Sequence, residues 1–170
     1  VALVICAESE HSALLAEVVR ARPRIVLIAY AAPTRHPLPE WLLGQGYREH
    51  IRNLQRQWAR STGAPVVSAS ITGPWCSGLP GIPALKVRSH FQGRSAIVDA
   101  RGQVLAALDR EEGVIVATLE LGEPRPGVPL PAGPWVGRPI KGWVRGALDL
   151  VGWLGARSYG AWQRRERSTR

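Results

Sequence analysis

Cys6 is the first residue of the sequence whose type and setting could do chemistry. It follows the apolar run Val1–Ile5 and precedes Ala7 and Glu8. The sites of α/β proteins gather at the carboxyl ends of strands, where a thiol would be displayed as a nucleophile. A helix starting just after Cys6 would favour the thiolate, and the N–H of Ala7 would face a developing oxyanion. Free cysteines are also among the most buried residues, so the local pattern alone favours a buried thiol.

The spacing of the other polar residues provides no base and no metal site for this thiol. His11 lies five residues further on and is expected on the surface of the following helix. The remaining histidines are spread over loops and a helix, at His36, His50 and His90. A Cys–His enzyme is therefore unsupported. A zinc site drawn from the two cysteines, His11 and His90 lacks the CxxC or HxxxH spacing of such sites, and no metal is expected.

The composition is that of one globular domain with a basic tail. The 170 residues suffice for a sizeable core, and no apolar run approaches the roughly 18 residues of a membrane-spanning helix. Two cysteines are too few for a disulfide framework, which indicates a reducing, cytoplasmic setting. Residues 136–170 hold eight basic and two acidic side chains of a chain whose net charge is +9. Most of the excess charge therefore lies in the tail.

The beginning of the chain alternates strand and helix. Apolar runs rich in β-branched residues predict buried strands at Val1–Cys6 and Ile25–Ala31. Helical spacing between them predicts a helix that Ser9 or Ser12 caps and Pro23 stops. Strand, helix and strand at this spacing predict parallel pairing through a βαβ crossover. The expected fold class is therefore α/β.

Further along, the patterns predict one long helix, more strands and several loops. The expected elements are a helix over Trp41–Ser61, strands over 63–73, Ser95–Asp99, Val104–Leu108 and Val114–Leu121, and Gly/Pro-rich loops over 33–40 and 74–90. Five prolines within 122–135 predict a linker or a surface arm. Apolar residues at helical spacing between Ile140 and Leu154 predict one basic amphipathic helix with Trp at its edges.

Three stretches follow one another in a specific order: "VALVICAE", "RPRIVLIAYAAP" and "FQGRSAIVDARGQVLAALDREEGVIVATLEL". In this order, residues 1–121 resemble the C-terminal half of the carbon–nitrogen hydrolase (nitrilase) superfamily. The first stretch is similar to the nucleophile motif, and the second to the next strand, which ends beside the active site. The third is similar to the family pattern Phe-x-Gly-x-Ser-x-Ile-x-Asp. The residues in register with it are Phe91, Gly93, Ser95, Ile97, Asp99 and Gly102.

The resemblance implies a cofactor-free α-β-β-α sandwich, present here in part, and a Glu-Lys-Cys triad. Cys6 matches the nucleophile, which forms a thioester or thioimidate with the carbon of a small amide or nitrile. Glu8 matches the acidic residue after it and is expected to support the site, with Ala7 as oxyanion donor. Tyr30 and Ala31 match the strand end that contacts substrate. The resemblance also implies a homo-oligomer.

The sequence also departs from the family pattern. In the family the Glu and the Lys both precede the Cys, whereas five residues precede Cys6, and Lys86 and Lys141 lie downstream. Because the chain also lacks Met, we expect the Glu and Lys on an upstream segment, and the 170-residue piece alone to be inactive and poorly stable. Ala7 stands where many members have an aromatic residue, and "EHSALL" replaces Phe-Pro-Glu. The substrate can therefore not be transferred from the family.

The expected organisation has three parts. Residues 1–121 form the C-terminal part of a carbon–nitrogen hydrolase domain, 122–135 a Pro/Gly-rich linker and 136–170 a basic amphipathic tail. The chain is then a fragment of a thiol-dependent hydrolase; the alternative is a non-catalytic homologue or a basic interaction module that binds an acidic surface through the tail. The tail itself has three open uses: packing on the core or a neighbouring subunit, contact with a membrane surface, or contact with nucleic acid. No nucleic acid is expected, because no recognised binding module accompanies the charge.

Overall fold

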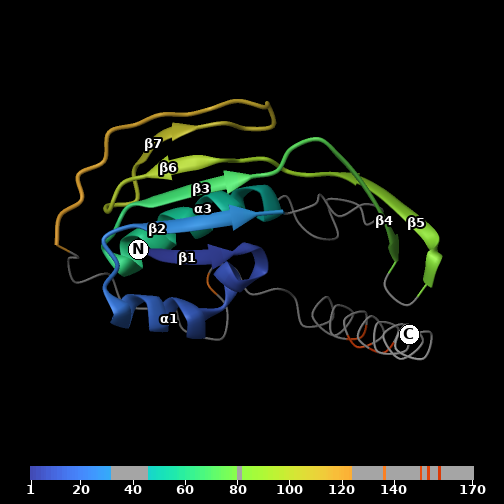
Figure 1. Cartoon of the computed structure of the whole chain (residues 1–170), viewed down its shortest axis with the longest axis horizontal. Helices are drawn as coiled ribbons and strands as arrows, with labels where there is room; N and C mark the ends of the chain where they lie inside the picture. The colour runs from blue at the N-terminus through green and yellow to red at the C-terminus, as the bar shows by residue number, and fades with distance from the viewer. Residues whose placement is uncertain are drawn as a thin grey trace, which may run out of the picture. The chain divides into compact units, whose positions relative to one another are not determined.

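The computed structural model describes residues 1–31, 46–79 and 82–123, together with Val136, Leu150, Trp153 and Arg157. In chain order its elements (Figure 1) are β1 Ala2–Ile5, the 3₁₀ turn η1 Cys6–Glu10, α1 Ser12–Ala21, β2 Val26–Tyr30, α3 Gly46–Thr62, β3 Val66–Ser70, β4 Pro74–Leu79, β5 Ile82–His90, β6 Ala96–Val98 and β7 Val104–Ala107. The chain divides into two units, Val1–Trp75 with Ser89–Arg138 and Cys76–Arg88 with Pro139–Arg170.

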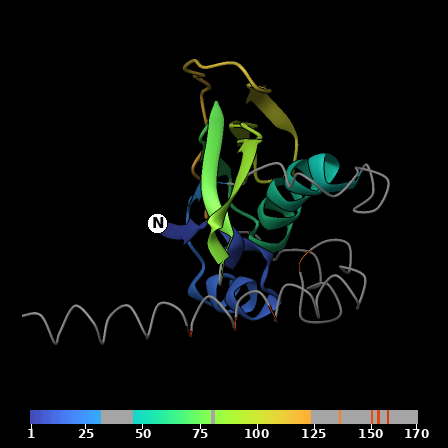
Figure 2. The same ribbon diagram turned by 90° about the vertical axis from the view of Figure 1, so that its right-hand side faces the viewer.

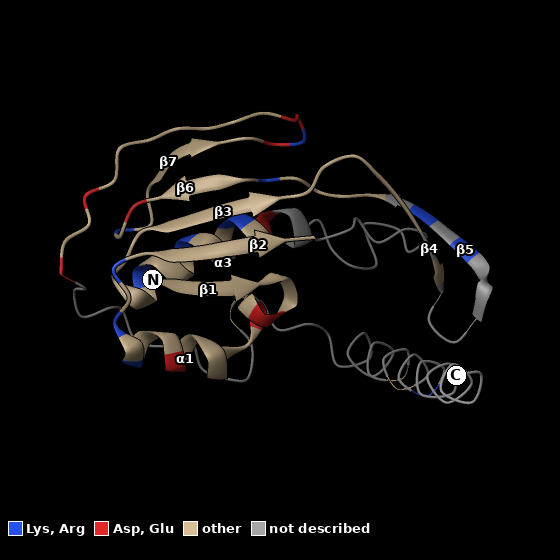
Figure 3. Cartoon of the chain, viewed as in Figure 1, with Lys and Arg blue, Asp and Glu red and all other residues tan. Residues whose placement is uncertain are grey.

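The main sheet has five strands in the order β1-β2-β3-β6-β7. The first three run parallel, with Ile5 paired to Ala29 and Ala29 to Ala69, whereas β6 and β7 are antiparallel. The predicted parallel crossover from the first strand through a helix to the second is therefore confirmed. None of the five strands contains a charged residue (Figure 3), as expected for strands of a buried sheet.

Both helices pack on one face of this sheet, and the strands alternate accordingly. In β2 the side chains of Val26, Ile28 and Tyr30 are buried in the core that α1 and α3 cover. Figure 2 shows α3 lying to one side of the sheet. On the opposite face apolar side chains are open to solvent: in β1, Leu3 and Ile5 are 68% and 56% exposed. The described residues of the first unit therefore include one helix layer and one sheet layer.

Residues 74–90, expected as a loop, instead contain the two-stranded sheet of β4 and β5. The prediction was wrong because Pro and Gly were taken as breakers. In a two-stranded ribbon the missing N–H of a proline can face water, so Pro is tolerated. Lys86, Arg88 and His90 alternate along β5 and are all exposed, which is the period of a strand with one wet face.

The strand expected over Val114–Leu121 is absent: the structure assigns no strand to residues 108–123. Side-chain exposure still alternates, with Val114 and Val116 almost fully exposed and Ile115 and Ala117 half-buried. A strand, however, requires a neighbouring ladder of backbone groups as well as the right residues. The segment has β-type composition but no strand pairs with it in the part of the chain that the structure describes.

The two C-terminal parts of the predicted organisation lie largely outside the described residues. Of the arm 122–135 the structure describes Gly122 and Glu123, and of the tail it describes Val136, Leu150, Trp153 and Arg157, the last three in helical conformation. Among the described residues no helix is long and apolar enough to cross a membrane.

Gly93, just before β6 in the chain, allows two backbone segments to approach each other closely. It has a φ of +68°, and a Cβ built on it would lie 2.3 Å from the carbonyl oxygen of Asp109. The next residue, Arg94, donates its backbone N–H to the same oxygen over 2.7 Å. Gly93 therefore permits a close backbone approach to the turn after β7.

We predict that Gly93→Ala lowers the free energy of unfolding by more than about 2 kcal/mol, because a left-handed residue and a steric clash are imposed together. Gly73→Ala has the same strain at φ +90° but nothing within 4 Å of its Cβ, and should lose less. Gly113→Ala meets only the side chain of Leu108 at 3.5 Å and serves as the neutral control. Urea unfolding measures all three; equal losses at Gly93 and Gly73 would show that the approach to Asp109 is unimportant.

Candidate active site at the Cys6 turn

Cys6 lies at the junction of β1 and η1 in an unusual backbone conformation. Its φ is +47°, in the left-handed region, and its side chain is partly exposed. For a residue with a Cβ this conformation costs roughly 1–2 kcal/mol. Strain of this kind persists where the surroundings hold it, and it is concentrated at functional sites. A sharp, strained turn between a strand and a helix is also the way in which some hydrolases display a nucleophile.

The helix after Cys6 differs from the prediction. A 3₁₀ turn, Cys6–Glu10, comes first, and α1 begins only at Ser12 with His11 as its N-cap residue. Neither Ser9 nor Ser12 is the cap residue, which corrects the prediction that one of them caps the helix. Because a helix dipole acts mainly within its first turn, the expected support of a thiolate by this helix is not provided by α1.

Ser9 has a different task from the one expected. Its side chain is fully buried, and its hydroxyl donates to the carbonyl oxygen of Cys6 over 2.7 Å. This hydrogen bond links Ser9 back to Cys6, the first residue of the turn. A short serine side chain commonly satisfies nearby backbone groups in this way.

Side chains of α3 and the backbone of Val136 form hydrogen bonds and an ion pair with the same turn. The indole N–H of Trp58 donates to the carbonyl oxygen of Ser9 over 2.7 Å, and Trp58 is fully buried. His50 Nε2 lies 3.7 Å from Glu10 Oε1. The backbone N–H of Val136, also fully buried, donates to the carbonyl oxygen of Glu10 over 2.8 Å. The sequence analysis missed Trp58, since its position at helical spacing indicated only a core residue.

The structure brings some of the predicted site residues to one sheet edge. Because Ile5 pairs with Ala29 in parallel register, Cys6 and Tyr30 follow at the carboxyl ends of neighbouring strands. Ala7 and Glu8 are exposed beside Cys6, and Ala31 is exposed at the end of β2. The side chain of Tyr30, in contrast, is buried in the core on the helix face. The roles of these residues stay predictions.

Within the described part of the chain, no three His, Cys, Asp or Glu side chains gather closely enough to hold a metal ion. His36 lies outside that part. His50 pairs with Glu10, and His11 and His90 are exposed on different elements. The two cysteines form no disulfide with each other.

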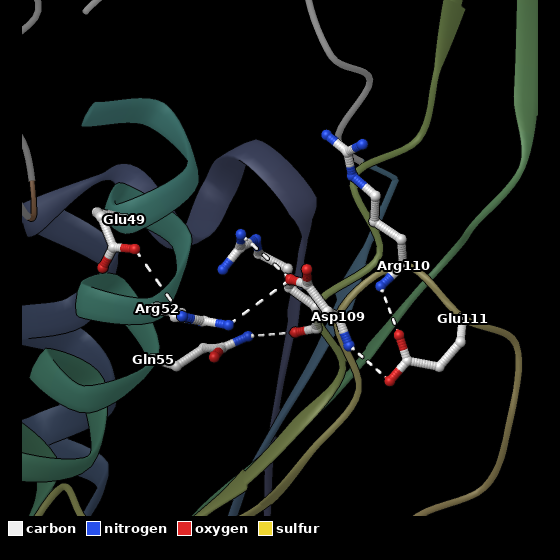
Figure 4. A network of polar contacts seen from close by, with 7 residues as sticks. Glu49, Arg52, Gln55, Asp109, Arg110 and Glu111 are labelled. Carbon is white, nitrogen blue, oxygen red and sulfur yellow. Dashed lines mark hydrogen bonds and ion pairs between the residues drawn. The ribbon is translucent and has the colours of Figure 1, made fainter. Parts of the chain in front are cut away.

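A second group of polar contacts joins α3 to the loop before β6 (Figure 4). Gln55 donates from Nε2 to Ser68 Oγ over 2.8 Å and to the carbonyl oxygen of Arg94 over 3.0 Å. The Arg94 guanidinium lies 3.1 Å from the Asp109 carboxylate, which Arg52 approaches to 3.6 Å. Arg94, like Cys6, has a positive φ. Side chains of α3 therefore support the backbone at two left-handed positions, Cys6 and Arg94.

The turn beyond Asp109 is held by a single carboxylate. Glu111 accepts the backbone N–H groups of Asp109 and Arg110 over 3.1 and 3.0 Å (Figure 4). Backbone hydrogen bonds, from Glu111 itself and from Asp109, lower the pKa of this exposed carboxyl. These two hydrogen bonds explain the shape of the turn.

Comparison with known proteins identifies the fold and the family of this chain. The crystal structure of carbon-nitrogen hydrolase from Helicobacter pylori G27 has a similar fold, with a TM-score of 0.59 at 20% identity. The match covers 70% of this chain and 39% of that chain, and at this identity it concerns the fold alone. A comparison with curated protein sequences finds no match. The model of the family described as carbon-nitrogen hydrolase matches residues 1–126, about three quarters of the sequence. The α/β fold is thus nitrilase-like, and the chain belongs to the carbon–nitrogen hydrolase family.

Proposed function

We propose that this chain is the C-terminal part of a thiol hydrolase that cleaves carbon–nitrogen bonds of small amides or nitriles, with Cys6 as nucleophile. The observation that carries the proposal is the left-handed Cys6 at the carboxyl end of β1, in a chain of this family. Strained backbone conformations of this kind are concentrated at functional sites, which supports a functional role for Cys6.

The reaction follows from the thiol. The Cys6 thiolate adds to the carbonyl carbon, the C–N bond breaks, and the amine leaves with a proton, which forms a thioester. Water then adds, the C–S bond breaks, and the acid and the thiol are released. A nitrile forms a thioimidate, takes up water and loses ammonia to reach the same thioester. The backbone N–H of Ala7, an exposed residue, is the proposed oxyanion donor, and Glu8 supports the site.

The general base and the lysine of the triad are proposed to lie on residues upstream of Val1. Lys86 is exposed on β5, downstream of the nucleophile. The open face of the main sheet supports a missing layer, because apolar side chains such as Leu3 and Ile5 are rarely left uncovered in a stable domain. A second sheet packed there would complete a sandwich.

We also propose a cytoplasmic setting and a homo-oligomer. Two cysteines without a disulfide fit a reducing compartment, which we propose to be the cytoplasm. Val114 and Val116 are 89% and 86% exposed on one short segment. Such neighbouring apolar side chains support a contact with a second subunit, and therefore a homo-oligomer.

A second candidate function comes from the basic tail. Leu150 and Trp153 are helical and more than half exposed, and the Arg157 guanidinium lies 4.6 Å above the Trp153 ring. Exposed Trp and Leu with Arg on one helix are typical of helices that lie on anionic lipid. Eight basic side chains in residues 136–170 add attraction to such a surface. We therefore propose membrane-surface binding as the alternative use of this chain.

Cys6→Ala in the full-length protein should lower turnover by at least about 10³-fold, because no other group forms the acyl-enzyme. Cys76→Ala changes the other free cysteine, which is exposed on β4, and should leave turnover unchanged. Ammonia or amine release from a panel of amides and nitriles measures both variants. Turnover that survives in Cys6→Ala would remove Cys6 from the mechanism.

The left-handed conformation of Cys6 lowers the stability of the protein, so a residue that adopts this conformation freely should be better tolerated at this position. Cys6→Gly should be more stable than Cys6→Ala by about 0.5–1 kcal/mol, because glycine adopts a positive φ freely. Arg22, the C-cap of α1, has the same φ of +47°, so Arg22→Gly against Arg22→Ala is the matched pair.

Thermal or urea unfolding measures both pairs. Arg22→Gly should gain stability and keep full turnover, whereas both Cys6 variants lose turnover. If the Cys6→Gly protein is less stable than the Cys6→Ala protein, the left-handed conformation of residue 6 is not held in solution.

Deleting residues 139–170 tests the second candidate while keeping Val136, which bonds to Glu10. The full chain should co-sediment with vesicles of phosphatidylglycerol and phosphatidylcholine, less with pure phosphatidylcholine, and less again at high salt. The shortened chain should lose this binding, and Trp153→Ala should weaken it. Equal binding by the full and shortened chains would rule the tail out as the membrane contact.

A further inference from the structure

We propose that Trp58 is a positioning residue for Cys6, acting through the carbonyl oxygen of Ser9. Its effect on the conformation of Cys6 needs no assumption about the reaction, whereas its effect on turnover rests on the proposed function. Trp58 lies on α3, 52 positions after Cys6, and its indole N–H donates to the turn.

The link consists of two short hydrogen bonds in series. The indole N–H of Trp58 donates to the Ser9 carbonyl over 2.7 Å, and the Ser9 hydroxyl donates to the Cys6 carbonyl over 2.7 Å. Trp58 and Ser9 are both completely buried. Away from water each bond is strong, and a buried acceptor left without a donor is costly. The position of Ser9 is therefore set by α3, and the position of the Cys6 carbonyl by Ser9.

The turn needs such a tie because its own structure is weak. A 3₁₀ helix of five residues has strained hydrogen-bond geometry. Its first residue, Cys6, is in the left-handed region, which the chain leaves readily when nothing opposes it. Glu10 is held by His50 and Val136 at the far end of the turn. The Ser9 link leads back to Cys6 itself.

The φ of Cys6 decides where its sulfur points. Rotation from the left-handed region to the extended or helical region turns the Cα–Cβ bond about the backbone and moves Sγ away from its present place. Small displacements of a reacting group lower a rate strongly without weakening substrate binding. Loss of the indole bond should thus act on the chemical step.

Trp58→Phe in the full-length protein keeps an aromatic ring in the core and removes the donor. Its kcat should fall about tenfold with KM unchanged, as expected when one buried hydrogen bond no longer orients the nucleophile. The ¹³C chemical shifts of Cys6 Cα and Cβ, which report backbone conformation, should move toward extended or averaged values. Val66→Ala, at a fully buried position of β3, is the control for general loss of stability and should leave these shifts and kcat in place.

Ser9→Ala breaks the second bond of the series with a smaller change in volume, and serves if Trp58→Phe fails to fold. It should shift the Cys6 signals in the same direction. Cys6 signals that do not move in either variant would overturn the proposal whatever the activity. Equal losses of kcat in Trp58→Phe and Val66→Ala would reduce Trp58 to a core residue.

Failure of the proposed function has a different signature. If the wild-type protein releases no ammonia or amine from any amide or nitrile, yet Trp58→Phe moves the Cys6 signals, the hydrolase assignment fails and the positioning of Cys6 by Trp58 stands.

Discussion

Parallel pairing of β1, β2 and β3 is the constraint on which the rest of this structure depends. Parallel neighbours need a long connection on a face of the sheet, and here helices α1 and α3 make those connections on the same face. The carboxyl ends of the three strands then meet at one edge, where Cys6 follows β1 and Tyr30 ends β2. The same arrangement leaves Leu3 and Ile5 on a face without cover.

Helix α3 connects this sheet to two of its strained backbone positions, Cys6 and Arg94. Trp58 donates to the turn that Cys6 begins, and Gln55, three residues earlier on the helix, donates to the carbonyl oxygen of Arg94. Cys6 and Arg94 are both non-glycine residues with positive φ. A strained conformation persists only where neighbouring groups over-determine it. The buried face of one helix supplies those groups for Cys6 and Arg94, so the geometry of the candidate site depends on the packing of α3.

Membership of the carbon–nitrogen hydrolase family and the exposed apolar face of the main sheet support the same proposal, that a second layer completes the sandwich. The matched part of the Helicobacter pylori structure is 39% of that chain, so most of a comparable protein has no counterpart here. A sheet that buries side chains on one face and exposes apolar ones on the other forms half of a core. On the proposed function, the residues that cover that face would also bring the base and the lysine to Cys6.

Much of the fold could be predicted from the sequence because its signals are local. The apolar runs at Val1–Cys6 and Ile25–Ala31 and the helical spacing between them determined two strands, a helix and their parallel pairing. The place of Cys6 after a strand favoured a buried thiol by itself, and the family resemblance made it a candidate nucleophile. The order of three motifs determined the family, which the match over residues 1–126 confirms.

Other features depended on partners distant in the sequence. The segment Val114–Leu121 has the composition of a strand but no strand beside it, and residues 74–90 form a ribbon that their prolines and glycines concealed. No local pattern could show that Ser9 closes the Cys6 turn instead of capping a helix, or that Trp58 donates to Ser9 across 49 positions. The sequence by itself determined which residues could form strands, helices and a nucleophile. Only the tertiary structure decided the pairing of β4 with β5 and the conformation of Cys6, because both depend on hydrogen bonds between groups that folding alone brings together.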